Sequence, residues 1–342
     1  MIELLLPCPL SAGWELLWQQ NLPRQAGALP LGGFSGMELD WPGRRLWLLS
    51  DAPRTHSLEL SWRGGVRQPQ FLLKAPQHLT DQGNSRLDGE ALVRAGQGGR
   101  FWMASEGRTG LKSKAALLEL APTELGGFRV LRRSALPEAW QPAEGFGMRS
   151  NRGPEALVAL TPDRLLLAPE SELQQDQGGQ LRLLLARLQG PDLIFSPLGA
   201  RLQVASPSGY EAHWGLTALV PAELTKRSKK HTPLLLALWR GYAEPDSWWN
   251  RLSLLPRIPL EAKAGAPLSP LMSWNLKRIG LEPDNWEAME GGPPLEDGRP
   301  TLLLASDDNF NPLQQNRLAL LAPRRSGRCQ SLPMGEPLTH DG

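Results

Sequence analysis

Three glutamates recur at one position of a repeated sequence pattern, and this spacing could bring them together. Glu90, Glu155 and Glu287 each precede Ala and then Leu or Met, ahead of a short apolar segment. Ser35 and Thr217 hold the same position in two further copies of the pattern. Carboxylates gathered at one site repel each other, so they raise each other's pKa or hold a cation. The three glutamates are therefore candidate catalytic residues.

A second group of acids follows the apolar segment of most copies. In an antiparallel hairpin the end of one strand lies beside the start of its partner, so both groups of acids can share one face. Calcium takes six to eight oxygen ligands at about 2.3–2.6 Å, and acids together with hydroxyls and amides such as Asn285 and Asn309 suit it. We therefore expect calcium as the cofactor. The candidate ligands are Glu90, Glu155, Glu287, Asp51, Glu106, Glu170, Asp307 and Asp308.

The same acids also admit a structural interpretation. An Asp after a strand often caps a turn by accepting hydrogen bonds from backbone N–H groups, and a repeated acid can tie one repeat to the next. Zinc is disfavoured, because the five His form no His-Glu-x-x-His motif and Cys8 and Cys329 are the only thiols. Calcium binding and turn capping both stay open at this point.

Short apolar segments must position these residues. Residues 45–49, 100–104, 164–168 and 301–305 are examples, each about five residues long and bounded by Gly, Pro, Asn or Asp. Long stretches with helical periodicity are hard to find. The repeated position falls at residues 35, 90, 155, 217 and 287, at intervals of 55, 65, 62 and 70 residues. A unit of roughly 50 residues with several strands is typical of a propeller blade.

We therefore expect an all-β protein with a β-propeller fold. Five repeat units are visible, and six blades result if both chain ends build another one. Closure by N- and C-terminal strands is expected, with residues 316–321 pairing with residues 2–7 or 14–18. The expected domain organisation is a single propeller over residues 1–330, followed by a flexible C-terminal tail over residues 331–342.

Composition excludes several classes of protein. The 342 residues are 41% hydrophobic and 21% charged, which is enough for a sizeable core. Lys and Arg number 37 against 35 Asp and Glu, and a net charge of +2 excludes a globally basic nucleic-acid binder. The apolar runs are far shorter than the ~20 residues of a membrane span, and the first residues lack the basic region of a signal peptide. We expect a cytoplasmic location and no nucleic-acid or membrane partner, and the pattern indicates no oligomeric state.

Four groups of segments resemble one known family. They are Gly32–Met37 with Ser50–Asp51, Asp88–Leu92 with Ala104–Gly107, Asn151–Leu157, and Asn285–Met289 with Ser306–Phe310. Through them residues 32–321 resemble the phytase-like proteins, a family known by the description "esterase-like activity of phytase". One departure is systematic, since Ala91, Ala156 and Ala288 stand where the family has Gly.

The resemblance implies a hydrolase of phosphomonoesters or related esters, assisted by calcium at an acidic ring on the propeller axis. A small anionic substrate is then the expected partner. Arg152 and Arg86 stand beside motif acids and could steer the anion, and Lys277 is a further candidate. Each of these cations could instead form a salt bridge between blades. The alternative hypothesis is a non-catalytic propeller that binds or scaffolds and keeps the acidic ring for stability.

Overall fold

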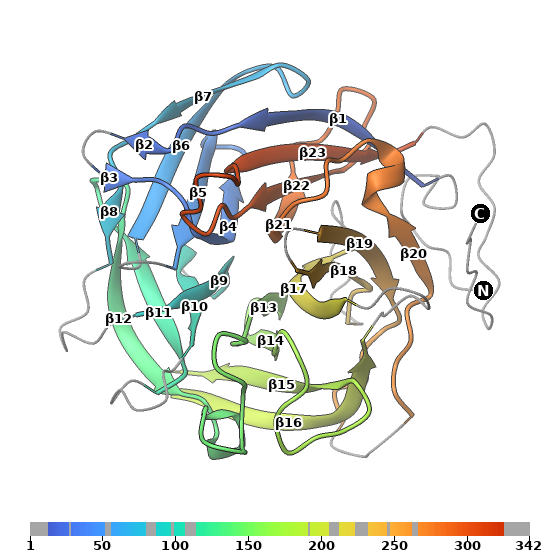
Figure 1. Ribbon diagram of the computed structural model, residues 1–342. Coiled ribbons are helices and arrows are strands. Elements are labelled where there is room, and N and C mark those ends of the chain that lie inside the picture. Colours follow the sequence, from blue (N-terminus) through green and yellow to red (C-terminus); the bar gives the residue numbers. More distant parts are fainter. Residues whose placement is uncertain are drawn as a thin grey trace.

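Five antiparallel sheets surround a common axis in the computed structural model (Figure 1). The structure describes residues 13–26, 29–51, 56–79, 87–96, 99–106, 114–190, 192–204, 212–222, 232–244, 247–261 and 266–324. Cys8, Cys329, Arg86, residues 2–7 and the expected tail over residues 331–342 lie outside these described residues. The fold is thus an all-β arrangement of five propeller blades.

The first three blades each run outward from the axis in chain order. Blade 1 contains β4 (Phe34–Asp40), β5 (Arg45–Ser50), β6 (His56–Gly64) and β7 (Pro69–Leu73), and the short β8 (Gln77–His78) pairs with β6. Blade 2 contains β9 (Gly89–Arg94), β10 (Phe101–Ser105), β11 (Ala116–Pro122) and β12 (Phe128–Ala135). Blade 3 contains β13 (Ala156–Thr161), β14 (Arg164–Ala168), β15 (Gln180–Gln189) and β16 (Asp192–Gln203).

Blade 4 consists of four consecutive strands, whereas blade 5 combines the first described strand with the last three. Blade 4 contains β17 (His213–Pro221), β18 (Leu235–Ala243), β19 (Ser247–Leu255) and β20 (Met272–Asn275). Blade 5 contains β21 (Trp286–Gly292), β22 (Thr301–Ser306) and β23 (Arg317–Pro323), with β1 (Trp14–Asn21) as its outer strand. β1 pairs antiparallel with β23, and Trp14 faces Pro323 at one end of this ladder.

Little of the described chain lies outside the blades. A two-stranded ribbon is formed by β2 (Gln25–Ala26) and β3 (Leu29–Pro30). Single 3₁₀ turns are η3 (Glu138–Trp140) and η4 (Leu276–Ile279). Among the described residues, no helix has the length and apolar character that a membrane crossing requires.

The hydrophobic core is divided into five clusters, and each cluster fills the space between two neighbouring blades. Leu48 of blade 1 packs with Leu303 of blade 5, for example, and Trp102 of blade 2 packs with Leu184 of blade 3. The five clusters join blades 1 and 2, 2 and 3, 3 and 4, 4 and 5, and 5 and 1. Burial of apolar area between blades therefore closes the circle and fixes the inner strands around the axis.

Candidate functional site

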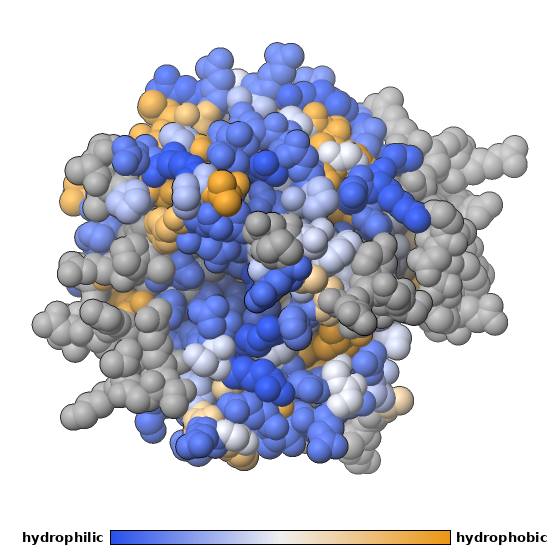
Figure 2. Space-filling view, viewed as in Figure 1, coloured by the Kyte–Doolittle hydropathy of each residue, from blue (hydrophilic) through white to orange (hydrophobic). Residues whose placement is uncertain are grey.

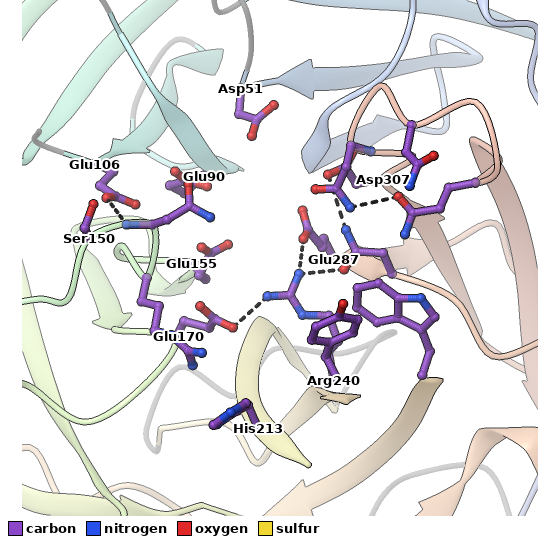
Figure 3. Close-up of a pocket in the computed structure, with 18 residues that line it drawn as sticks. Asp51, Glu90, Glu106, Ser150, Glu155, Glu170, His213, Arg240, Glu287 and Asp307 are labelled. Atoms are coloured by element: carbon purple, nitrogen blue, oxygen red, sulfur yellow. Dashed lines mark hydrogen bonds and ion pairs between the residues drawn. The ribbon is translucent and has the colours of Figure 1, made fainter. Parts of the chain in front are cut away.

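Both groups of acids contribute to one pocket at one end of the propeller axis (Figure 3). This axial pocket has a volume of about 510 Å³. Hydrophilic residues predominate around the centre of this face of the molecule (Figure 2). All five blades or their connecting loops supply side chains to it. The acids that line the axial pocket are Asp51, Glu90, Glu106, Glu155, Glu170, Glu287 and Asp307.

Local breaks in strand pairing position the first group. The register between β9 and β10 skips Glu90, and the register between β21 and β22 skips Glu287. Ser35 of β4 and Thr217 of β17 are skipped in the same way. A β-bulge leaves one residue unpaired and re-aims its side chain, which here happens at the second residue of β4, β9 and β21 and in the middle of β17. Glu155 directly precedes β13.

The two hydroxyl residues of this group tie neighbouring inner strands together. Ser35 Oγ donates to the carbonyl of Gly89, which belongs to the next blade. Thr217 Oγ1 lies 3.2 Å from the carbonyl oxygen of Trp286, again in the next blade. These two side chains are absent from the lining of the axial pocket and act as links between blades.

Glycines make room for two acids of the second group. The carboxylate of Glu170 lies over Gly215, where a Cβ atom would stand 2.3 Å from Oε1. Glu106 lies over Gly153 in the same manner, since a Cβ atom there would stand 2.9 Å from Oε2. Each acid therefore reaches across the first residues of the following blade. A side chain at either glycine would force the carboxylate away.

Arg240 is the cation at the centre of the site. It follows the apolar part of β18 and pairs with Gly215, in the place that an acid takes in the other four blades. Its Nη2 donates to Glu170 Oε1 at 2.6 Å and its Nη1 donates to Asn285 Oδ1 at 2.6 Å. Nη1 also donates to Glu287. Arg240 thus bridges three blades through its guanidinium group.

The sequence pattern did not single out Arg240, because the charged residues that recur in it are acids. In the fourth copy of the pattern, which contains Thr217, the apolar segment covers residues 234–239, and Arg240 is the next residue. In the other copies the residue after the apolar strand is Asp or Glu, sometimes one position later. Alignment of the five copies by this position would have marked Arg240 as the exception.

Burial and mutual repulsion change the acidity of the pocket. Burial, followed by the charge of Glu155, holds the pKa of Glu90 well above its usual range. Burial and then Glu170 act in the same direction on the pKa of Glu155, which Arg240 partly offsets. Burial raises the pKa of Glu287 to about 7 although Arg240 lowers it. Burial and the charge of Glu287 raise the pKa of Asp307. The pocket therefore favours protons or another positive charge.

The remaining lining is polar or aromatic, and the sequence pattern did not single out most of it. Asn285, which the pattern did mark, is buried beside Arg240. Arg152 lines the axial pocket, as does the exposed His213. Tyr242 and Trp248 of blade 4 are half-buried. The other lining residues are Ser150, Asn151, Asn309, Asn311 and Gln314.

Two of the expected site residues stand elsewhere. Asp308 accepts hydrogen bonds from Phe310 N at 3.0 Å and Asn316 Nδ2 at 3.1 Å, so it holds the loop after β22 and does not line the pocket. Lys277 is exposed on η4 and is also absent from the lining. Arg86 lies outside the described residues. Of the three expected substrate-binding cations, the structure places Arg152 at the pocket.

The donor set fits calcium in chemical type. Carboxylate and amide oxygens line the axial pocket, and these are the ligands of a hard cation. Within the described ranges, however, no three Asp, Glu, His or Cys side chains stand close enough to form a metal cluster. Arg240 forms ion pairs with Glu170 and Glu287, and Asp307 accepts hydrogen bonds from Asn285 Nδ2 and Asn309 N. The other acids that line the pocket are Asp51, Glu90, Glu106 and Glu155.

The departures at Ala91, Ala156 and Ala288 are accommodated without strain. All three are buried at the start of β9, β13 and β21. Among the described non-glycine residues, positive φ occurs at Arg44, Asn151, Asn309 and Phe310. The three alanines therefore need no glycine conformation.

The fold and site define a five-bladed β-propeller with a carboxylate-lined axial pocket. The family model "Phytase-like: Esterase-like activity of phytase" matches residues 29–310, so the chain belongs to this family. No curated protein matches it. A chain in the "Cryo-EM structure of RAG in complex with one melted RSS and one unmelted RSS" is similar at 13% identity, over 89% of this chain and 83% of that chain, with a TM-score of 0.35. A likeness at that TM-score carries no functional argument.

Proposed function

We propose that the chain is a phytase-like hydrolase that cleaves phosphomonoesters or related esters in the axial pocket, with calcium as its cofactor. The observation that carries the proposal is the gathering of seven carboxylates with Arg152 and Arg240 around one cavity of about 510 Å³. The family match makes ester hydrolysis the first reaction to test. A small anionic ester is the substrate that this proposal requires.

The charge of the pocket supports a role for a cation. Seven carboxylates face two arginines, so a fully ionised pocket carries five negative charges in excess and repels an anion. Protons or a divalent cation must offset that charge before a phosphate can enter. Calcium would offset it, polarise a phosphoryl oxygen and activate water. The acids proposed to hold it are Asp51, Glu90, Glu106 and Glu155, which neither pair with Arg240 nor accept from Asn285.

The chain's own residues supply binding and proton transfer. Arg152 and Arg240 can orient an anionic ester by charge-assisted hydrogen bonds. A group with a pKa near the working pH transfers protons efficiently, and the pKa of Glu287 is about 7. We assign Glu287 as the proton donor to the leaving oxygen. Glu155 and Glu90 complete the proposed catalytic set, because they are buried in the same pocket.

Phosphate release from a model monoester tests this function. Activity should rise with added calcium and vanish with chelator. Glu155→Gln and Glu287→Gln should abolish it, whereas Glu138→Gln, an exposed acid on η3 outside the pocket, should leave it unchanged. Unchanged turnover in both pocket variants would remove the acids from the mechanism.

A binding or scaffold propeller is the second candidate, and the Arg240 network favours it. Arg240 of blade 4 connects Glu170 of blade 3 with Asn285 and Glu287 next to or in blade 5, so the site also links neighbouring blades. This candidate predicts no turnover, together with a lower melting temperature on substitution of the acids. Turnover well above background by the unaltered chain would exclude it.

A further inference from the structure

Blade 4 supplies the part of the axial pocket that carries no carboxylate. Its contribution consists of His213 on β17, Arg240 and Tyr242 on β18, and Trp248 on β19. The other lining includes acids from each of the remaining blades or the loops beside them. The pocket is therefore two-sided, with acids around most of its circumference and an aromatic wall next to one arginine. Figure 3 shows His213 and Arg240 on this side of the pocket.

The aromatic wall is a row of cross-strand neighbours. His213 pairs with Tyr242 across β17 and β18, and Tyr242 pairs with Trp248 across β18 and β19. The Tyr242 and Trp248 rings lie 4.6 Å apart between centroids with an interplanar angle of 42°. Both rings are half-buried and both line the pocket, so each presents apolar surface to it.

Arg240 is a close neighbour of these aromatic residues. Side chains two residues apart on a strand share a face, which puts Arg240 and Tyr242 on the same side of β18. The Arg240 Cζ atom lies 6.0 Å from the centroid of the Trp248 ring. A guanidinium group and an indole ring are thus neighbours at one side of the pocket.

Arg240 also retains donor capacity. Its Nη1 makes two hydrogen bonds, to Asn285 and Glu287, and its Nη2 makes one, to Glu170. A guanidinium group has five N–H donors, so these bonds account for three of them. The contacts of Arg240 within the described chain assign no acceptor to the Nε donor or to the second Nη2 donor. An oxyanion beside Trp248 could accept from them.

We propose that Tyr242, Trp248 and His213 form a subsite for a flat aromatic group of the substrate, whose anionic head is bound by Arg240. This inference rests on the proposed function and narrows its substrate class to aryl phosphomonoesters and related aryl esters. Aromatic rings stack on Tyr and Trp in offset or tilted geometries, and Tyr242 and Trp248 both line the pocket. An alkyl ester has no ring to place there and gains only the contact with Arg240.

Two phosphonates separate binding from turnover, because their C–P bond is not hydrolysed. We expect phenylphosphonate to bind the full chain at least tenfold more tightly than methylphosphonate, measured by calorimetry with calcium present. Trp248→Ala should bring the two affinities within about twofold of each other, and Trp248→Phe should keep most of the difference. The matched control is Trp41→Ala, because Trp41 follows β4 and does not line the axial pocket. Like Trp248, it is half-buried, packed on an aromatic ring and beside an arginine.

The outcomes distinguish this subsite from the proposed function. Equal affinity for both phosphonates, or an equal loss of both in Trp248→Ala, overturns the subsite. Tighter binding of tetramethylammonium than of phenylphosphonate also overturns it, since the wall then serves a cation. Turnover of phenyl and ethyl phosphate with equal efficiency would support the proposed hydrolase function and contradict the aromatic subsite. Much tighter binding of phenylphosphonate than of methylphosphonate, without turnover of phenyl phosphate, would support the aromatic subsite and contradict the proposed hydrolase function.

Discussion

Arg240 Nη2 and Glu170 Oε1 lie 2.6 Å apart, and this ion pair joins a residue of blade 4 to the loop after the second strand of blade 3. Arg240 stands where the other blades have an acid, so blade 4 supplies a positive charge at the position where the other blades supply a negative one. Glu287 of blade 5 contacts the same guanidinium group. Arg240, in the place of an acid, therefore offsets part of the negative charge that a bound cation would offset. It does so on one side of the pocket.

Removal of the Arg240 charge should destabilise the propeller. Arg240→Gln leaves Glu170 and Glu287 buried without their cation, and breaking a buried ion pair by removing one partner costs about 3–5 kcal/mol. The free energy of unfolding in urea, measured at neutral pH in chelator, should fall by about that amount. Arg45→Gln is the control, because the Arg45–Asp40 pair is exposed at its arginine and such pairs contribute about 0–1 kcal/mol. Equal losses for the two variants would show that the Arg240 pairs add no stability.

Addition of one methyl group at Gly215 should disrupt the same pair. The new Cβ atom would stand 2.3 Å from Glu170 Oε1, so the carboxylate must move away from Arg240. Overpacking of this kind costs about 1–3 kcal/mol. Gly65→Ala serves as the control, since no heavy atom lies within 4 Å of its Cβ position. We expect its unfolding free energy to change by less than about 0.5 kcal/mol.

A double-mutant cycle identifies the atom responsible. In a Glu170→Ala background the clashing carboxylate is gone, so Gly215→Ala should cost less there than in the unaltered chain. The same cost in both backgrounds would mean that Gly215 matters for its backbone and not for the space it leaves to Glu170.

Local sequence patterns were sufficient to predict a β-propeller and its five visible repeat units, although they left a sixth blade possible, which the described residues do not form. Each strand is short, its apolar residues alternate or run together, and turn residues bound it, so the repeat could be recognised without any contact between distant segments. The positions of Glu90, Glu155 and Glu287 followed from the repeat, because equivalent residues of equivalent blades lie at one end of the axis. The expectation of calcium rests on the chemistry of those acids and stays a prediction.

Other parts of the site depend on side-chain direction and on contacts between blades. Asp307 and Asp308 are neighbours in the chain, but the first faces the pocket and the second holds the loop after β22. The meeting of Tyr242 with Trp248 depends on the register of β18 and β19, which turn residues alone do not define. Arg240 gains its role from Glu170 and Glu287, 70 and 47 residues away along the chain.

Calcium should stabilise the chain through Asp51, Glu90, Glu106 and Glu155. A ligand that binds only the folded state raises stability by RT ln(1 + [L]/Kd), so the melting temperature should rise with calcium concentration. Glu90→Gln removes a carboxylate from this group and should shift the calcium response to higher concentration. Glu138→Gln should respond like the unaltered chain, because this acid is exposed outside the pocket. A melting temperature that is independent of calcium would exclude a calcium site in the axial pocket.

Stability in chelator should fall as the pH rises from about 5 to 8. Burial raises the pKa of Glu287 from 4.5 to about 7, so in this interval the folded chain binds a proton that the unfolded chain has lost. The stability gained from that proton is present below pH 4.5 and disappears as the pH passes 7. The raised pKa values of Glu90, Glu155 and Asp307 act in the same direction. Urea midpoints measured across this range check the slope, and Glu287→Gln should make it shallower because Gln does not titrate. A midpoint that rises with pH in chelator would contradict the burial of these carboxyl groups in their protonated form.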